Sequence, residues 1–223
     1  MFKLENKQLG TALIINGIVF SIIILLWPII MAIAPGTEGT ISEQFSEIAS
    51  NQVLYRLNFF IASLIGPSIL SLMLIFAFFI ETKKATPILN MLGIIFLIPY
   101  IIFVTISYTS QYTYFINLLN SNVDLANEWY FGNFNSLPYY FNQLGYTFFA
   151  IGAIFIGIRF CFDSGIKKAF GIILELCALL SIIAFIGLLL GNKSLNSATI
   201  ISGLLTLPFG LLAIIIGRKL KNQ

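Results

Sequence analysis

The chain has 223 residues, of which 58% are hydrophobic and 9% are charged, and its mean hydropathy is +0.96. A soluble globular domain carries about 25% charged residues, so this composition excludes an ordinary soluble fold and indicates a protein surrounded by lipid. The net charge of +3 forms no basic face with interleaved aromatic residues, which argues against a nucleic-acid partner. No polar stretch is long enough for a second domain, so we expect residues 1–223 to form one transmembrane domain.

The residue types that most often carry enzyme chemistry are scarce. The sequence contains no histidine, which removes histidine-based acid–base catalysis and nearly every zinc, haem or copper site. Its two cysteines, Cys161 and Cys177, fall at different depths and are expected to be reduced thiols. We therefore expect a protein that is not an enzyme and that holds no metal or other cofactor.

Six apolar runs reach the roughly 20 residues that a helix needs to cross a bilayer. They cover residues 10–34, 52–80, 87–110, 139–162, 169–190 and 197–217. Runs of this length favour helices over barrel strands. The predicted fold class is all-α: a polytopic membrane protein with six transmembrane helices.

The cationic residues predict the orientation of these helices. Ten of the twelve fall on one side of the predicted membrane: Lys3, Lys7, Lys83, Lys84, Arg159, Lys167, Lys168, Arg218, Lys219 and Lys221. The other two, Arg56 and Lys193, fall on the opposite side. Because loops rich in lysine and arginine stay inside, we expect a plasma-membrane protein with both termini in the cytoplasm.

The first outer loop contains a short amphipathic helix. Thr40 and Glu43 have the spacing of a capping box, and Ile41, Phe45 and Ile48 follow at helical intervals. Such a helix either lies on the outer membrane surface or packs over the mouth of the bundle, and the sequence favours neither.

Glycines and prolines occur inside the predicted spans. The glycines are spaced for close helix packing: Gly10 and Gly17, Gly187 and Gly191, and Gly203, Gly210 and Gly217. Pro67, Pro99 and Pro208 fall near the middle of the second, third and sixth spans. Interrupted helices at this depth are typical of transporter binding sites, although membrane helices also tolerate proline.

A ligand site is predicted at the outer end of the second span. Arg56 and Asn58 lie there, and the second outer loop, residues 111–138, contributes Glu128 and Trp129 among many aromatic residues. An arginine in this setting can bind a carboxylate or phosphate. Alternatively, Arg56 ties the surface helix or the loop to the bundle through Glu47 or Glu128.

A buried ion pair is predicted near the cytoplasmic side. Arg159 and Glu175 lie at similar depths on two antiparallel spans joined by a short turn. A charge at this depth is costly unless it is paired or hydrated. Two interpretations stay open: a carboxylate that responds to protons or cations, or a structural pair that fixes the register of the hairpin.

Several segments resemble a family of uncharacterised bacterial integral membrane proteins with six or seven helices, a domain of unknown function. The segments are residues 47–51 running into 54–57, residues 148–157 with the following Arg159, Ser164 with Gly165, and Gly171. The resemblance implies the same membrane architecture and a bacterial origin. It implies no activity, because that family has no established one.

These observations lead to two functional hypotheses. In the first, the protein binds or transports a small lipophilic or weakly anionic compound through an outward-facing pocket lined by Arg56, Asn58, Glu128 and Trp129. In the second, it is a structural or regulatory subunit whose small-residue seams bind another membrane protein or a second copy of the chain. Membrane lipids are expected partners in both.

Overall fold

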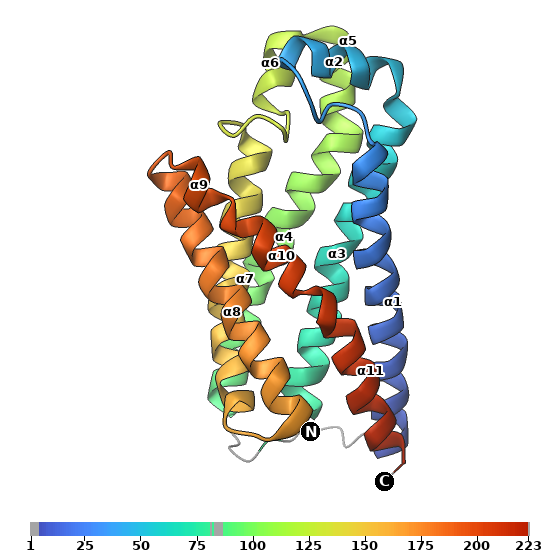
Figure 1. Ribbon diagram of the computed structural model, residues 1–223, viewed down its shortest axis with the longest axis vertical. Coiled ribbons are helices and arrows are strands. Elements are labelled where there is room, and N and C mark those ends of the chain that lie inside the picture. Colours follow the sequence, from blue (N-terminus) through green and yellow to red (C-terminus); the bar gives the residue numbers. More distant parts are fainter. Residues whose placement is uncertain (1–4, 81, 83–86, 223) are drawn as a thin grey trace.

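The computed structural model describes residues 5–80, 82 and 87–222, so the cations Lys3, Lys83 and Lys84 lie outside the described residues. Six long apolar helical segments run along the molecule and are able to span a membrane (Figure 1). Five are α1 (Asn6–Ile33), α3 (Gln52–Phe79), α4 (Pro87–Ser110), α7 (Leu137–Cys161) and α8 (Gly165–Leu189). The sixth combines α9 (Lys193–Asn196), α10 (Ala198–Leu205) and α11 (Leu207–Lys221). The described residues form helices and no strands, which confirms the predicted fold class.

The spans form a ring in which neighbours in sequence are mostly neighbours in space. Helix α3 packs between α1 and α4, and α7 packs between α4 and α8. The sixth span closes the ring by crossing it diagonally, with α10 against α8 and α11 against α1 (Figure 1). The start of α1 and the end of α11 lie at one end of the molecule, called here the terminal end, and the opposite end is called the lid end (Figure 1).

The sixth span is interrupted at Thr206, between α10 and α11. Pro208 has no backbone N–H, so it cannot bond to the carbonyl four residues earlier. The Thr206 hydroxyl and N–H both donate to the Gly203 carbonyl, at 2.7 and 3.1 Å, and so finish α10. Pro67 and Pro99 lie inside α3 and α4, which continue past them. One of the three predicted interruptions therefore occurs.

Phenylalanines fill the interior at the terminal end. Phe76 of α3 stacks on Phe170 of α8 at 4.0 Å and meets Phe160 of α7 edge-on at 5.7 Å. Phe209 of α11 packs on Phe170 at 5.5 Å. All four rings are buried, and we call them the aromatic plug. Each aromatic pair adds about 0.5–1.5 kcal/mol beyond simple burial.

Facing glycines bring α1 and α11 together. A methyl group on Gly10 would lie 2.5 Å from the Gly217 carbonyl oxygen, and one on Gly17 would lie 2.6 Å from that of Gly210. The predicted packing role of these four glycines is confirmed. Gly203 differs, because no atom lies within 4 Å of the position of an added methyl group.

The lid end is covered by short helices: α2 (Ile41–Ser50), α5 (Ile116–Ser121) and α6 (Val123–Glu128). We call these helices and residues 129–136 the lid. Helix α4 runs without a break through a π-helical turn, η1 (Gln111–Phe115), into α5. The expectation that residues 111–138 form a loop from their first residue is therefore wrong, since no glycine or proline stops the helix there.

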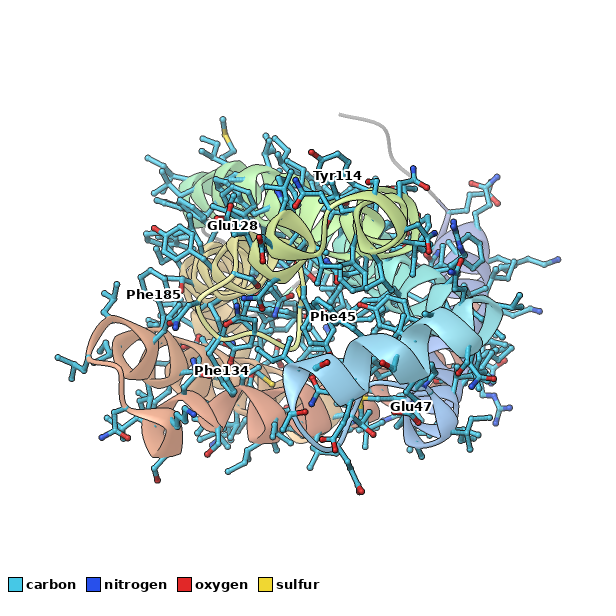
Figure 2. The ribbon with its side chains drawn as sticks, turned by 90° about the horizontal axis from the view of Figure 1, so that it is seen from above. Phe45, Glu47, Tyr114, Glu128, Phe134 and Phe185 are labelled. Atoms are coloured by element: carbon cyan, nitrogen blue, oxygen red, sulfur yellow. The ribbon has the colours of Figure 1, made fainter. Side chains whose placement is uncertain are left out.

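Helix α2 forms as predicted and packs over the mouth of the bundle. The Thr40 N–H and hydroxyl donate to Glu43 Oε2 at 2.7 and 2.8 Å, and these two hydrogen bonds lower the pKa of the Glu43 carboxyl. The Glu43 N–H donates back to the Thr40 hydroxyl. The Phe45 ring is buried against Phe115 at 5.6 Å and Tyr130 at 5.2 Å. Figure 2 shows Phe45 directed into the molecule and Glu47 on the other side of α2. Of the two predicted placements, the structure has the second.

Tyr130 fastens the lid to the end of α1. Its hydroxyl donates to the Gly36 carbonyl at 2.6 Å, and the Gly36 N–H donates to Glu47 Oε2 at 2.8 Å. Gly36 has a φ of +83°, a conformation that favours glycine. Burial, with the nearby Glu47 charge, raises the pKa of Tyr130 to about 12. The hydroxyl therefore keeps its proton, and the hydrogen bond, at neutral pH.

Candidate functional site

Arg56 acts as a tie between two helices. Its Nη1 donates to the backbone carbonyl of Tyr112 in η1 at 2.6 Å, and the side chain is half-buried. The alternative of a structural tie is therefore the one that the contacts support. The partner is a backbone carbonyl rather than the predicted acidic side chain.

The other predicted ligand residues do not join Arg56 in one pocket. Asn58 is two residues further along α3, so it projects from nearly the opposite face and is buried. The Trp129 ring packs edge-on against Tyr114 at 4.9 Å, and Glu128 is exposed on the α5–α6 side of the lid (Figure 2). Among the described residues, the predicted set Arg56, Asn58, Glu128 and Trp129 is thus divided among three places.

A surface depression of about 440 Å³ lies elsewhere on the lid, between α2 and the α5–α6 segment. Its lining consists of Ile41, Ser42, Phe45, Ser46, Ala49, Leu119, Val123, Asp124 and Asn127. None of the predicted ligand residues lines it.

The predicted ion pair between Arg159 and Glu175 is not formed, although both residues are described. The Arg159 guanidinium reaches across the interior and donates to the backbone carbonyls of Phe76 and Ile80 at the end of α3. Glu175 lies instead against Gly157, on the face of α7 that meets α8. Residues 157 and 159 are about 200° apart around α7, so the two charged groups point in different directions.

A buried glutamine organises the junction between the bundle and the lid. Gln111 is fully buried in η1, and its Oε1 accepts from the Tyr55 hydroxyl at 2.9 Å and the Phe131 N–H at 3.0 Å. Its Nε2 donates to the Trp129 carbonyl at 2.9 Å and the Ser110 hydroxyl at 3.1 Å. The π-helical turn places this side chain toward the lid, and such turns often occur at functional sites.

Two asparagines face the interior below the lid without partners. Asn58 of α3 and Asn142 of α7 are 7% and 3% exposed, and the side-chain oxygen of each has no hydrogen-bond partner among the described residues. A buried polar group without a partner costs about 1–3 kcal/mol, and in lipid no water replaces the missing bond. Unpartnered polar groups of this kind are therefore candidates for ligand binding.

The two asparagines lie at the same level of the bundle. Asn58 precedes Phe76 by 18 residues on α3, and Asn142 precedes Phe160 by 18 residues on α7, which is five full helical turns in each case. Because Phe76 and Phe160 meet in the aromatic plug, both asparagines face the same interior about 27 Å nearer the lid. The sequence singled out Asn58 but not Asn142.

Tyr100 and Tyr108 of α4 lie near Tyr146, which is one turn from Asn142, and these three tyrosines with the two asparagines form what we call the polar cluster. Tyr146 is one turn below Asn142 on α7, and its ring packs on Tyr100 of α4 at 5.7 Å. The hydroxyls of Tyr108 and Tyr146 lie close enough to interact with each other. The Tyr100 hydroxyl is buried with no partner among the described residues.

A second polar network links α7 to the interrupted span. Thr199 of α10 donates to Gln143 Oε1 at 2.9 Å, and Gln143 Nε2 donates to the Tyr139 hydroxyl at 3.2 Å. Tyr139 in turn donates to Asn196 of α9, whose amide reaches the Ala184 carbonyl at 3.0 Å. These groups satisfy one another, in contrast to the polar cluster one turn away.

The described residues contain no group of three metal-ligating side chains. The arrangement offers hydrogen bonds and aromatic surface rather than charge, so it is suited to binding rather than to proton transfer or nucleophilic chemistry. Comparison with known proteins gives no match to a family model, a curated protein or a solved structure.

Proposed function

We propose that this six-span membrane protein binds a small lipophilic compound in the lid half of its bundle and carries it between the lid face and the membrane. The observation that carries the proposal is the pair of buried side-chain oxygens on Asn58 and Asn142, which lie at one level of the bundle and have no hydrogen-bond partner among the described residues. A ligand that bonds to both would remove the cost of leaving them unpaired.

The ligand is proposed to be uncharged. The polar cluster contains amide and phenol groups but no charged side chain, and Arg56 is held by the Tyr112 carbonyl. An ion would have to leave water without an opposite charge to receive it. Aromatic rings with a few hydrogen-bonding groups instead suit a neutral, lipophilic compound. The proposed ligand class is therefore narrower than the one expected from the sequence, which also included weakly anionic compounds.

Movement of the ligand is proposed to involve the interrupted sixth span. Its α9–α10 part is bound to α7 through Gln143 and Tyr139, and α11 is bound to α1 through glycines. The two parts can therefore follow different neighbours, with Thr206 as the joint. Interrupted helices are characteristic of many transporters.

The rival hypothesis, a regulatory subunit that binds another membrane protein, has less support. The glycine seams on which it depends are used inside the chain, between α1 and α11 and between Gly93 of α4 and Gly152 of α7. Among the described glycines in the interior of a transmembrane helix, Gly203 has open space around it, as does Gly165 at the start of α8.

The proposal predicts that leucine at Asn58 or Asn142 removes the ligand without harming the fold. Each substitution removes a buried amide whose oxygen has no partner, so the free energy of unfolding should stay the same or rise by up to about 1–3 kcal/mol. The unfolding temperature should therefore not fall. Native mass spectrometry from mild detergent should show a co-purified small molecule on the natural protein and its loss, tenfold or more, in either variant.

Asn90 supplies the matched control. Its Oδ1, like those of Asn58 and Asn142, is buried with no partner among the described residues, but its Nδ2 donates to the Ala77 carbonyl at 2.6 Å near the end of α3. Asn90→Leu should lower the unfolding temperature and keep the small molecule. Equal retention of the molecule in all three variants, or recovery of a specific dimer with no small molecule, would contradict the proposal and favour the subunit hypothesis.

We propose in addition that the terminal end is cytoplasmic and the lid faces outward. The described cations at the terminal end are Lys7, Arg159, Lys167, Lys168, Arg218, Lys219 and Lys221, against Arg56 and Lys193 nearer the lid. In a background with both native cysteines replaced, Glu38→Cys should react with a membrane-impermeant maleimide on intact cells. Asn222→Cys should react after lysis alone, and the reverse pattern would refute this orientation.

A further inference from the structure

Glu175 is an acidic side chain within the membrane-spanning part of α8. It lies ten residues from Gly165, where the helix begins, which is about 15 Å along the axis. Its carboxyl group sits against Gly157 of α7, where an added methyl group would be 2.7 Å from Oε1. Oε1 is buried and has no hydrogen-bond partner among the described residues.

The charged and titratable groups around Glu175 do not neutralise it. From α7, Arg159 points away toward the end of α3, and the partly exposed Cys161 interacts electrostatically with the carboxylate. From α8, Lys168 lies two turns nearer the terminal end and interacts with Cys161. No ion pair joins Glu175 to a cation within the described chain.

An isolated carboxylate at this depth is costly in its charged form. A carboxylic acid carries no charge and can place its hydroxyl and carbonyl beside the exposed helix backbone or lipid at much lower cost. With Arg159 turned away, a proton is the cation that neutralises the group most simply.

We propose that Glu175 is a proton-binding site within the membrane, exchanging its proton with water from the terminal end. The site is built by Gly157, which leaves room for the carboxyl group, and by the absence of a basic partner on the facing helix. Cys161, one turn nearer the terminal end and partly exposed, marks the direction of access. Asn142 lies 15 residues from Gly157, about 22 Å away, so the site is separate from the polar cluster.

Dicyclohexylcarbodiimide tests this proposal without any ligand, because this lipid-soluble reagent attacks protonated carboxyl groups in apolar surroundings. In vesicles of a zwitterionic lipid, we expect one adduct, located at Glu175 by peptide mass spectrometry. Its yield should fall tenfold or more between about pH 5 and about pH 9, because the protonated fraction drops about tenfold per pH unit above the pKa. Glu38 and Glu128, exposed on the lid, should stay unmodified and serve as internal controls.

Two variants complete the experiment. Glu175→Gln should abolish the adduct and keep the fold, since it replaces the acid with a neutral group of the same shape. Gly157→Ala should lower the yield severalfold, because the new methyl group displaces the carboxyl from α7. Absence of the adduct at every pH, a yield independent of pH, or a yield unchanged by Gly157→Ala would overturn the proposal. The ligand proposal is tested by a different measurement, the loss of the co-purified molecule from Asn58→Leu. Either proposal can therefore fail while the other stands.

Discussion

Replacing Gly210 with leucine is expected to separate α11 from α1 and to cost about 3 kcal/mol or more in stability. A single added methyl group would already lie 2.6 Å from the Gly17 carbonyl oxygen and collide with the Ser21 hydroxyl, which itself donates to that carbonyl at 2.7 Å. The obstacle is backbone, so it cannot rotate away, and overpacked interiors typically lose 1–3 kcal/mol for smaller intrusions. Thermal unfolding in detergent should show a large fall in the transition temperature.

Gly203→Leu is the matched control for this prediction. Gly203 lies in the same span, one helix earlier, and nothing occupies the space that a side chain would enter. We expect its unfolding temperature to remain near that of the natural protein, because the free energy of unfolding should change by less than about 0.5 kcal/mol. If the two variants were equally stable, the contact between α1 and α11 would not be the one described here.

Local features of the fold were predictable because their causes lie within a few residues. Thr40 and Glu43 specify the start of α2 through hydrogen bonds that reach three residues along the chain. The spacing of Gly10 and Gly17, and of Gly210 and Gly217, similarly marks faces that pack closely. These patterns need no knowledge of the partner helix.

The rotation of each helix about its axis was not predictable in the same way. Arg159 and Glu175 were matched in depth, and α7 and α8 are neighbours as expected. The face of α7 that meets α8 carries Gly157, however, whereas Arg159 faces α3. Depth follows from counting residues, but facing direction depends on which side chains the packed bundle accepts.

The polar cluster illustrates the same limit. No sequence motif marks Asn142, and the sequence predicts Asn58 as a ligand residue only because it is close to Arg56 along the chain, with which it shares no helix face. Their common orientation becomes evident once Phe76 and Phe160 are known to touch, because each asparagine lies five turns from one of them. Contacts between helices distant in sequence supply this information.

Replacing Gln111 with leucine is expected to release the lid from the bundle. The substitution removes the acceptor for the Tyr55 hydroxyl and the Phe131 N–H, and the donor to the Trp129 carbonyl. Each of these groups would then be left without its partner at a cost of about 1–3 kcal/mol, so the total loss should exceed about 3 kcal/mol. Hydrogen exchange should rise most in residues 129–136, the part of the lid that Gln111 holds directly.

Gln52→Leu makes the same chemical change at the lid end without the same network. The Gln52 Nε2 donates a long 3.5 Å hydrogen bond to Asn120 Oδ1, near the solvent-exposed start of α3. Its loss should change stability by less than about 0.5 kcal/mol and leave exchange in residues 129–136 unaltered. If Gln111→Leu behaved like Gln52→Leu, the lid would be held without Gln111, by aromatic contacts such as Phe45 with Phe115 and by the hydrogen bond from Tyr130 to Gly36. A loss of stability in Gln111→Leu but not in Gln52→Leu would instead show that the buried Gln111 amide holds the lid, since the aromatic rings are unchanged in both variants.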